Sequence, residues 1–314
     1  MKLDVVICTH TPRASVLDRV IEALARQTAR PPAFRVLLID NASSPPVAQS
    51  VLNPLSRAGI DARIVVEPVL GLPYARLRAL AETTSNWVLF VDDDNELAER
   101  FVEEGLAFLE AHRRVGAFGG KLLLPSGLAL PAWKTPFLTY LGIKDAGDSV
   151  LESTSDNWGP WEPPGAGLFV RREVLQAYAD RVSRDPRGLL LGRRGNKVLS
   201  SCDDSFLVRQ APRLGFALAY VPQLKLVHHL EPHRLRYSML LRLLVAFGSS
   251  LALLDALVHE SAIVPPQYRG WFRRAVTAWH GYRVGRRRSH RFGLAMVGHH
   301  LAAGHTWAQL RERR

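Results

Sequence analysis

The stretch "NWVLFVDDDN", residues 86–95, ends a hydrophobic run in three consecutive carboxylates. Like charges this close repel and raise each other's pKa unless a cation or hydrogen-bond donors compensate. Asp and Asn are ordinary turn residues, so a solvated turn is one explanation. A binding site at the end of a buried strand is the other, and the surrounding sequence has to decide between them.

The first hundred residues alternate between strand and helix patterns. Short β-branched runs are each followed by a stretch with helical spacing of apolar residues, one of them near 47–58. This alternation predicts βαβ units and a mostly parallel sheet with right-handed crossovers, an α/β fold. The predicted strands of this part are 3–9, 34–43, 61–68 and 86–95.

Polar side chains stand at the carboxyl ends of three of these strands: Thr9, Asp40 and the acids of the opening stretch. Ligands collect at that edge of a parallel sheet, which favours a site over a turn. Side chains alternate along an extended segment, so Asp92 and Asp94 face one way and Asp93 the other. Two converging carboxylates suit a hard divalent cation, which in turn would hold a diphosphate. An Asp-X-Asp triplet by itself is weak evidence.

The chain after residue 98 has a different pattern. A helix and a strand are followed by a Pro-, Gly- and Trp-rich region, 125–165, in which we expect loops. A strand running into a helix, a loop with a further helix and a last strand, 217–230, come next, and the pattern is helical from 235 onward. We therefore divide the chain into two successive halves and a basic helical extension. The predicted boundaries are 1–98, 99–234 and 235–314.

Composition limits the class of protein. The 314 residues are 47% hydrophobic and 22% charged, which is typical of a globular protein with one large domain or two modest ones. The two cysteines, Cys8 and Cys202, lie far apart, which argues against a disulfide framework and fits a reducing compartment. The apolar run at the N-terminus is too short for a signal peptide, so we expect a cytoplasmic protein.

Six motifs occur in an order and spacing that match a known family. They are "VVICTHTPR", "LLIDNAS", "VLGLPYAR", "FVDDDN", "GAGLFVRREV" and "CDDSFLVRQAPRLGF". Together, over residues 3–235, they resemble the family 2 inverting glycosyltransferases of the GT-A fold. The resemblance implies a Rossmann-like, mostly parallel sheet with flanking helices. It also implies transfer of a sugar from a UDP-, GDP- or dTDP-sugar to a glycan, lipid-linked or small-molecule acceptor.

The resemblance also assigns residues. Asp203 matches the general base, and Asp94 and His228 match ligands of Mn²⁺ or Mg²⁺, with His229 competing for the second position. A positioned Asp can take the acceptor's proton while a divalent ion stabilises the leaving diphosphate. The nucleotide-binding set is Thr9, His10, Asp40, Asn41, Gly71, Arg76, Asp92 and Asp93. We further predict an acceptor-binding set of Trp158, Trp161, Gly165 and Asp204, because the tryptophans lie beside Gly and Pro in a loop where they could stack on a sugar. With these assignments, residues 1–98 become the nucleotide-sugar-binding half and residues 99–234 the acceptor-binding and catalytic half.

Two departures from the family pattern stand out. The family commonly has Tyr-Asn after the first-strand Thr, where this chain has His10 and Thr11. Its base motif usually has Glu before Asp, where this chain has Cys202 before Asp203. The second departure leaves two alternatives open: a register shift that makes Asp204 the base, and a non-catalytic relative.

Structural alternatives exist for the candidate residues. Asp40 with Asn41 suits an Asx-turn or a helix cap, and Asp203 suits the cap of the helix that follows it. His228 could be a histidine satisfied at a strand end, and the tryptophans could be core anchors. Among other functions, a sugar-phosphate nucleotidyltransferase would carry a Gly-rich loop after the first strand, but "CTHTPRAS" has no glycine. Nucleic-acid binding is disfavoured because no recognised motif occurs.

The C-terminal third is basic and partly apolar. The net charge is +12, and arginines are dense after 269, with three in a row at 286–288. The uncharged stretch 243–254 has twelve residues, short of the roughly twenty that a membrane-spanning helix needs, so we expect a buried or interfacial helix. Aromatic residues between the arginines suit peripheral contact with an anionic membrane on its inner face. A basic helical cap over the catalytic domain is the alternative.

Overall fold

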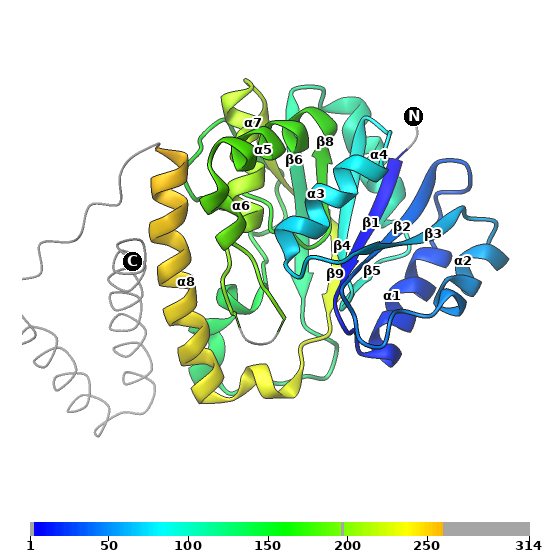
Figure 1. Ribbon diagram of the computed structural model, residues 1–314, viewed down its shortest axis with the longest axis horizontal. Helices are drawn as coiled ribbons and strands as arrows, with labels where there is room; N and C mark the ends of the chain where they lie inside the picture. Colours follow the sequence, from blue (N-terminus) through cyan, green and yellow to red (C-terminus); the bar gives the residue numbers. More distant parts are fainter. Residues whose placement is uncertain (1–2, 196–197, 260–314) are drawn as a thin grey trace, which may run out of the picture.

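The computed structural model describes residues 3–195 and 198–259, which form a mixed sheet covered by helices on both faces (Figure 1). The strand order is β3-β2-β1-β4-β8-β6-β9-β5, and β7 also pairs with β9. The strands are β1 Leu3–Thr9, β2 Phe34–Asn41, β3 Ala62–Glu67, β4 Trp87–Asp92, β5 Asn95–Leu97, β6 Val115–Leu123, β7 Leu151–Ser153, β8 Leu168–Arg171 and β9 Ala217–His228. The α-helices are α1 Ala14–Ala25, α2 Asn53–Arg57, α3 Leu72–Glu82, α4 Phe101–Ala111, α5 Arg172–Arg184, α6 Asp203–Val208, α7 Gln210–Arg213 and α8 Tyr237–Val258. Short 3₁₀ helices are η1 Gln49–Leu52, η2 Ala132–Phe137, η3 Thr139–Leu141, η4 Pro186–Leu190 and η5 Pro232–Leu235.

The first four strands form the predicted parallel part of the sheet. β1 pairs in parallel with β2 and with β4, and β2 pairs in parallel with β3. Because side chains alternate along a strand, Val5 and Ile7 join a core cluster with α1 and α4, while Val6 joins a second cluster with α3 and α5. Both faces of this part of the sheet are therefore buried, which explains its near-continuous hydrophobic strands.

The remaining strands extend this sheet in mixed orientation. β8 is antiparallel to both β4 and β6, so β6 and its parallel partner β9 run in the same direction as β4. The carboxyl end of β9 therefore lies at the same edge as the carboxyl ends of β1 and β4, the lower edge in Figure 1. The sheet continues across the boundary predicted at 98/99, and the three-part division of the chain stays a prediction.

Two details differ from the sequence expectation. The helix expected near 47–58 is two short pieces, η1 and α2, because the ring of Pro54 clashes with a carbonyl four residues earlier in a continuous helix. The strands β5 and β7 were not expected, since three residues are too few to give an alternating pattern.

The helix α8 is longer than its apolar stretch suggested. It runs for 22 residues, so the argument that it is too short to span a membrane was wrong. By length and composition it could cross a bilayer, yet 59% of its most apolar 18-residue window is buried inside the protein. A buried helix therefore agrees with the structure. The arginine-rich segment after residue 269 lies outside the described residues.

Candidate active site

The strand-end acids lie where the sequence predicted, at the carboxyl edge of the sheet. Thr9, at the end of β1, donates a hydrogen bond from its hydroxyl to the carboxylate of Asp93. Cys8 lies opposite Asp92 in the register of β1 and β4. The register of two parallel strands thus fixes the start of the acidic stretch beside Thr9.

The three acids differ in their ionisation. Burial and the charge of Asp94 raise the pKa of Asp92, and the same two causes raise the pKa of Asp93 to about 7. Burial also acts to raise the pKa of Asp94, but the charge of His228 and its hydrogen bond leave that pKa below its ordinary value. Asp94 is therefore the acid of the three whose surroundings favour the ionised form, which is the form that a cation ligand needs.

His228 and His229 have separate surroundings. β5 pairs with β9 so that Asn95 lies opposite His228, which brings the His228 Nε2 to 3.2 Å from the Asp94 Oδ2. The His229 Nε2 instead lies 2.8 Å from the Glu96 Oε2. The structure therefore brings the side chain of His228, and not that of His229, to the Asp94 carboxylate.

This pair fits part of a divalent metal site. Within residues 3–195 and 198–259, no group of three or more His, Cys, Asp or Glu side chains could hold a metal ion unaided. The Asp94 carboxylate and the His228 imidazole supply two ligands, and the buried His228 Nδ1 has no hydrogen-bond partner. Mg²⁺ and similar ions typically take one or two carboxylates and complete their shell with water and phosphate oxygens. The residues present fit such an ion when a diphosphate is bound.

Two arginines that the sequence reasoning missed face the same acids. The Arg234 Nη1, from η5, lies 4.0 Å from the Asp94 Oδ2, and the Arg234 Nε is buried without a hydrogen-bond partner. Burial and the charge of Arg193 lower the pKa of Arg234 to about 10, which leaves it charged at neutral pH. The Arg193 charge also acts on Asp92 and Asp94. In the sequence, these arginines could have been noticed only as part of the motifs "GRRG" and "EPHRLR". The second motif follows β9, which ends at the edge of the sheet where the acids lie.

Asp40 and Asn41 build the loops beside this edge. The carboxylate of Asp40 accepts hydrogen bonds from the amides of Ser43 and Val47, three and seven residues later, so it stabilises the loop after β2 without forming the i to i+2 bond of an Asx-turn. The Asn41 side chain accepts from the Gly71 amide at 2.8 Å and donates to two carbonyls of the loop after β3. Gly71 has φ of +144°, which L side chains rarely adopt. Their contact with a nucleotide stays a prediction.

His10 lies next to this loop cluster. Its Nδ1 is 2.9 Å from the Asn41 carbonyl oxygen. A Cβ built on Gly195 would lie 3.4 Å from the His10 Nε2, so the loop after η4 approaches the imidazole closely. The residue that replaces the family's usual Tyr therefore connects β1, β2 and this loop.

Asp203 forms a buried ion pair with Arg76. The Arg76 Nη1 lies 2.6 Å from the Asp203 Oδ2, and both side chains are almost fully buried. Burial raises the pKa of Asp203 to about 6, although the charge of Arg76 opposes the shift. Burial acts to lower the Arg76 pKa, but the charges of Asp203 and Asp204 raise it, so Arg76 stays charged. A carboxylate with a pKa near 6 is suited to accept a proton at neutral pH.

Asp204 points to a different partner. Its carboxylate accepts hydrogen bonds from the Gly165 amide at 2.8 Å and from the Ser205 amide at 2.9 Å. A Cβ on Gly165 would lie 2.5 Å from the Arg76 Nη2, so a larger residue there would push the guanidinium aside. Asp204 therefore fixes a loop, and Asp203 is the carboxylate paired with Arg76.

The two tryptophans of the predicted acceptor site are not alike. Trp158 is 65% exposed, whereas Trp161 is partly buried and packs against the core cluster that contains Cys202. Next to Trp161, the buried Glu162 pairs with Arg209 at 2.9 Å. The exposed Trp158 keeps a face free for a sugar, and the packing of Trp161 matches the core-anchor alternative.

Comparison with known sequences identifies the family. The sequence profile described as Glycosyl transferase family 2 matches residues 4–178, more than half of the chain. The chain belongs to glycosyl transferase family 2. Asp94 lies inside the matched segment, while Asp203, His228 and Arg234 lie beyond it. No curated protein matches the sequence.

Solved structures share the fold of this chain. The mannosyltransferase PcManGT from Pyrobaculum calidifontis, in complex with GDP-Man and Mn²⁺, superposes with a TM-score of 0.59 at 14% identity, covering 99% of this chain and 88% of that one. S. aureus TarS 1-349 in complex with UDP-GlcNAc gives 0.50 at 15% identity, covering 83% and 71%. A further TarS structure gives 0.51 at 16% identity, covering 83% of this chain, which spans 42% of that TarS chain. At these identities the likeness shows the GT-A fold.

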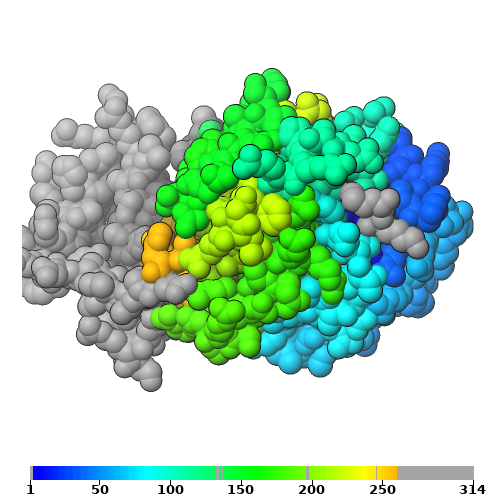
Figure 2. All heavy atoms as spheres, turned by 90° about the horizontal axis from the view of Figure 1, so that it is seen from above, coloured from blue at the N-terminus to red at the C-terminus, as the bar shows by residue number. Residues whose placement is uncertain are grey.

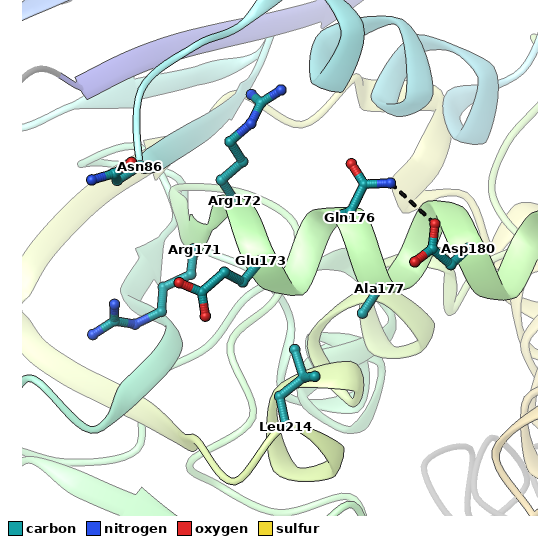
Figure 3. A pocket seen from close by; sticks show the side chains of 8 residues that line it. All are labelled: Asn86, Arg171, Arg172, Glu173, Gln176, Ala177, Asp180 and Leu214. Atoms are coloured by element: carbon teal, nitrogen blue, oxygen red, sulfur yellow. Dashed lines mark hydrogen bonds between the residues drawn. The ribbon is translucent and has the colours of Figure 1, made fainter.

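A separate hollow lies away from the strand-end acids of this glycosyltransferase (Figure 3). It has a volume of about 530 Å³ and lies beside the start of α5, with Asn86 and Arg171 among its lining residues. Asn86 precedes β4 and Arg171 ends the antiparallel β8, so the hollow is at the opposite edge of the sheet from Asp92. The guanidinium of Arg172 is occupied by carbonyl oxygens of Leu80 and Thr83. The hollow is therefore separate from the candidate active site.

Proposed function

We propose that this protein transfers a sugar from a nucleoside-diphosphate sugar to an acceptor hydroxyl with inversion, and that Asp203 is the general base. The observation that carries the proposal is the buried Asp203 carboxylate, paired with Arg76 at 2.6 Å. Its pKa is raised to about 6, and the charge of Asp92 contributes to that shift. A proton acceptor of suitable pKa therefore lies close to Asp92, one of the strand-end acids. We call these acids, together with Thr9, the donor side of the proposed site.

The donor side supplies groups for a diphosphate. Asp94 and His228 would hold Mn²⁺ or Mg²⁺, and Mn²⁺ accompanies GDP-Man in PcManGT. Such an ion acts as a Lewis acid that stabilises the charge developing on the leaving diphosphate. Arg234 and Arg193 face the same acids and add positive charge where the phosphates would lie.

The chemistry needs only one displacement. The acceptor oxygen attacks the anomeric carbon of the donor while its proton passes to the Asp203 carboxylate. The bond from that carbon to the diphosphate oxygen breaks, and the nucleoside diphosphate leaves with the electron pair. Because attack and departure occur on opposite faces, the product has the inverted configuration. Before the reaction, the charge of Arg76 favours the ionised form of Asp203, and the ion pair holds the carboxylate in its place in the site.

The donor class is a UDP-, GDP- or dTDP-sugar. TarS and PcManGT were solved in complex with UDP-GlcNAc and GDP-Man, which supports this donor class but does not select the nucleobase. The acceptor is a glycan, a lipid-linked sugar or a small molecule, and the exposed Trp158 offers it a stacking surface. We place the enzyme in the cytoplasm, with peripheral contact to the inner face of the membrane through the arginine-rich segment after 269.

Two measurements test the function. Calorimetric titration of UDP, GDP and dTDP into the full chain, with and without Mn²⁺, should give metal-dependent binding of at least one. The enzyme should then release that nucleoside diphosphate from the corresponding nucleotide-sugars. Failure of all three nucleotides to bind in the presence of Mn²⁺ or Mg²⁺ would contradict the proposal. For the membrane contact, a version ending near residue 266 should partition less onto anionic liposomes than the full chain does.

A further inference from the structure

The helix α8 contacts the loop that leads into the candidate base. Ser250, in the middle of α8, is buried, and its Oγ accepts a hydrogen bond from the Ser201 amide at 2.9 Å. The Ser200 Oγ lies 3.1 Å from the same oxygen. Ser201 precedes Asp203 by two residues, so a side chain far along the sequence holds the start of the catalytic segment.

Counting the available protons shows which of the two contacts of the Ser250 Oγ is a hydrogen bond, that of the Ser201 amide or that of the Ser200 hydroxyl. A serine hydroxyl has one proton and two lone pairs. The Ser250 hydroxyl donates to the Ala246 carbonyl at 2.8 Å, and the Ser200 hydroxyl donates to the Leu190 carbonyl at 2.8 Å. Both protons are then used, and the Ser250 oxygen remains free to accept from the Ser201 N–H. That backbone bond is therefore the link between α8 and the loop.

The loop needs such a link because its geometry is tight. Cys202 has φ of +66°, a left-handed conformation that few non-glycine residues adopt. A Cβ on Gly192 would lie 2.9 Å from the Asp203 Cγ, so the carboxyl group has little room to move on that side. With Arg76 at 2.6 Å, a small shift of the loop changes both the ion pair and the direction of the base.

The helix α8 is itself fixed to the body of the protein. Arg181 donates to the Leu257 carbonyl at 2.8 Å, and Arg213 donates to the Val258 carbonyl. These arginines, from α5 and α7, satisfy carbonyls that the helix end leaves free. Figure 2 shows the orange end of α8 against the yellow-green surface of the chain next to α7. Leu254 and Leu257 share a buried apolar cluster with Cys202. Polar and apolar contacts thus tie α8 to the catalytic segment.

We propose that Ser250 is a positioning residue for the base, through which α8 holds the segment 200–203 so that Asp203 stays aligned with Arg76 and the acceptor. The inference rests on the role proposed for Asp203. Its consequence is that α8 belongs to the catalytic apparatus, beyond the part of the chain that matches the family profile. A misplacement of about 1 Å in such a group can cost a hundredfold in rate, so the loss of one link should be measurable.

Hydrogen–deuterium exchange tests the link without any substrate. In the full chain, Ser250→Ala should increase exchange severalfold in peptides that span 199–208 and leave peptides around Thr9 and Asp94 unchanged. The matched control is Ser238→Ala, an exposed serine in the first turn of the same helix, which should change neither. Exchange at 199–208 equal to that of the wild type would overturn the proposal.

A double-mutant cycle then tests whether the link acts through the base. With UDP-GlcNAc and GDP-mannose as probe donors, Ser250→Ala should lower kcat for nucleotide release about tenfold and leave the affinity for UDP or GDP unchanged. In the Asp203→Asn background the same change should cost nothing further, because the group that it positions is already disabled. A full tenfold loss in that background would refute positioning of Asp203. An Asp203→Asn enzyme with normal turnover would instead refute the proposed function.

Discussion

The donor side and the base side of this site are built in different ways. On the donor side, Thr9, Asp92 and Asp94 stand at or just beyond the ends of adjacent parallel strands, and strand register alone brings them together. On the base side, Asp203 begins a six-residue helix after a left-handed Cys202, and its position depends on Arg76 and on a distant helix. The donor side is thus a product of the sheet, and the base side is a product of long-range polar contacts.

This difference predicts different consequences of mutation. The donor-side acids repel each other, so removing one takes away a ligand and relieves repulsion without unfolding the sheet. Removing one partner of a buried ion pair leaves an uncompensated charge and typically costs about 3–5 kcal/mol. Changes on the donor side should therefore alter binding, and changes on the base side should alter turnover and stability.

The largest effect is expected for Asp94→Ala. This variant should lose Mn²⁺-dependent binding of a nucleoside diphosphate altogether, because Asp94 is the proposed metal ligand and its pKa is lowered by His228. Asp92→Ala should weaken binding less, and both variants should keep a melting temperature near that of the wild type. Calorimetry with UDP and GDP measures the loss, and unchanged metal-dependent binding in Asp94→Ala would remove the metal site from the account.

Asp203→Asn should lower turnover about a hundredfold or more while nucleotide affinity stays near that of the wild type. The substitution removes the proton acceptor and keeps the shape of the side chain. Asp204→Asn is the comparison variant, because that carboxylate accepts hydrogen bonds from the Gly165 and Ser205 amides, whereas the ion pair at 2.6 Å joins Arg76 to Asp203. The opposite pattern, a loss for Asp204→Asn alone, would move the base by one residue.

The rate should also follow the ionisation of Asp203. Burial raises its pKa to about 6, and the base must be deprotonated to act, so the rate should fall about tenfold per pH unit below that value. Arg76→Gln removes the charge that opposes the shift and should move this acidic limb to higher pH. The pH profile of nucleotide release at saturating donor measures both. If the acidic limb of the pH–rate profile does not move in Arg76→Gln, the titrating group is not Asp203.

Arg234 sharpens the comparison because it serves the donor side from the C-terminal part of the chain. Arg234→Gln should weaken UDP or GDP binding about tenfold, the scale of one charge-assisted hydrogen bond. Arg236→Gln, an exposed arginine two residues later, is the control and should leave affinity unchanged. Equal affinities of the two variants would leave Arg234 without a role in holding the phosphates.

The sequence predicted the donor side better than the base side for a physical reason. Buried parallel strands give hydrophobic runs, and the polar residues that end them are visible by position alone, as with Thr9 and Asp94. The base side was placed through the motif around Asp203, but its partners were not predicted. Arg234 and Ser250 have no local pattern, because only tertiary packing brings them within reach of Asp94 and Ser201. The length of α8 was underestimated because the prediction counted only the uncharged stretch 243–254. That stretch leaves out the first turns of the helix, which contain Arg242 and polar residues.

The central claim, a single displacement assisted by one base, has a direct test in the stereochemistry of the product. Proton NMR of the anomeric signal, recorded as the full-length enzyme transfers the sugar of its donor to an acceptor hydroxyl with Mn²⁺, gives the configuration of the new glycosidic bond, which does not mutarotate. The account predicts that an α-linked donor yields a β-linked product, and that Asp203→Asn forms it at least about a hundredfold more slowly. A product that retains the α configuration would contradict the account, because a single displacement from the face opposite the leaving diphosphate inverts the anomeric carbon.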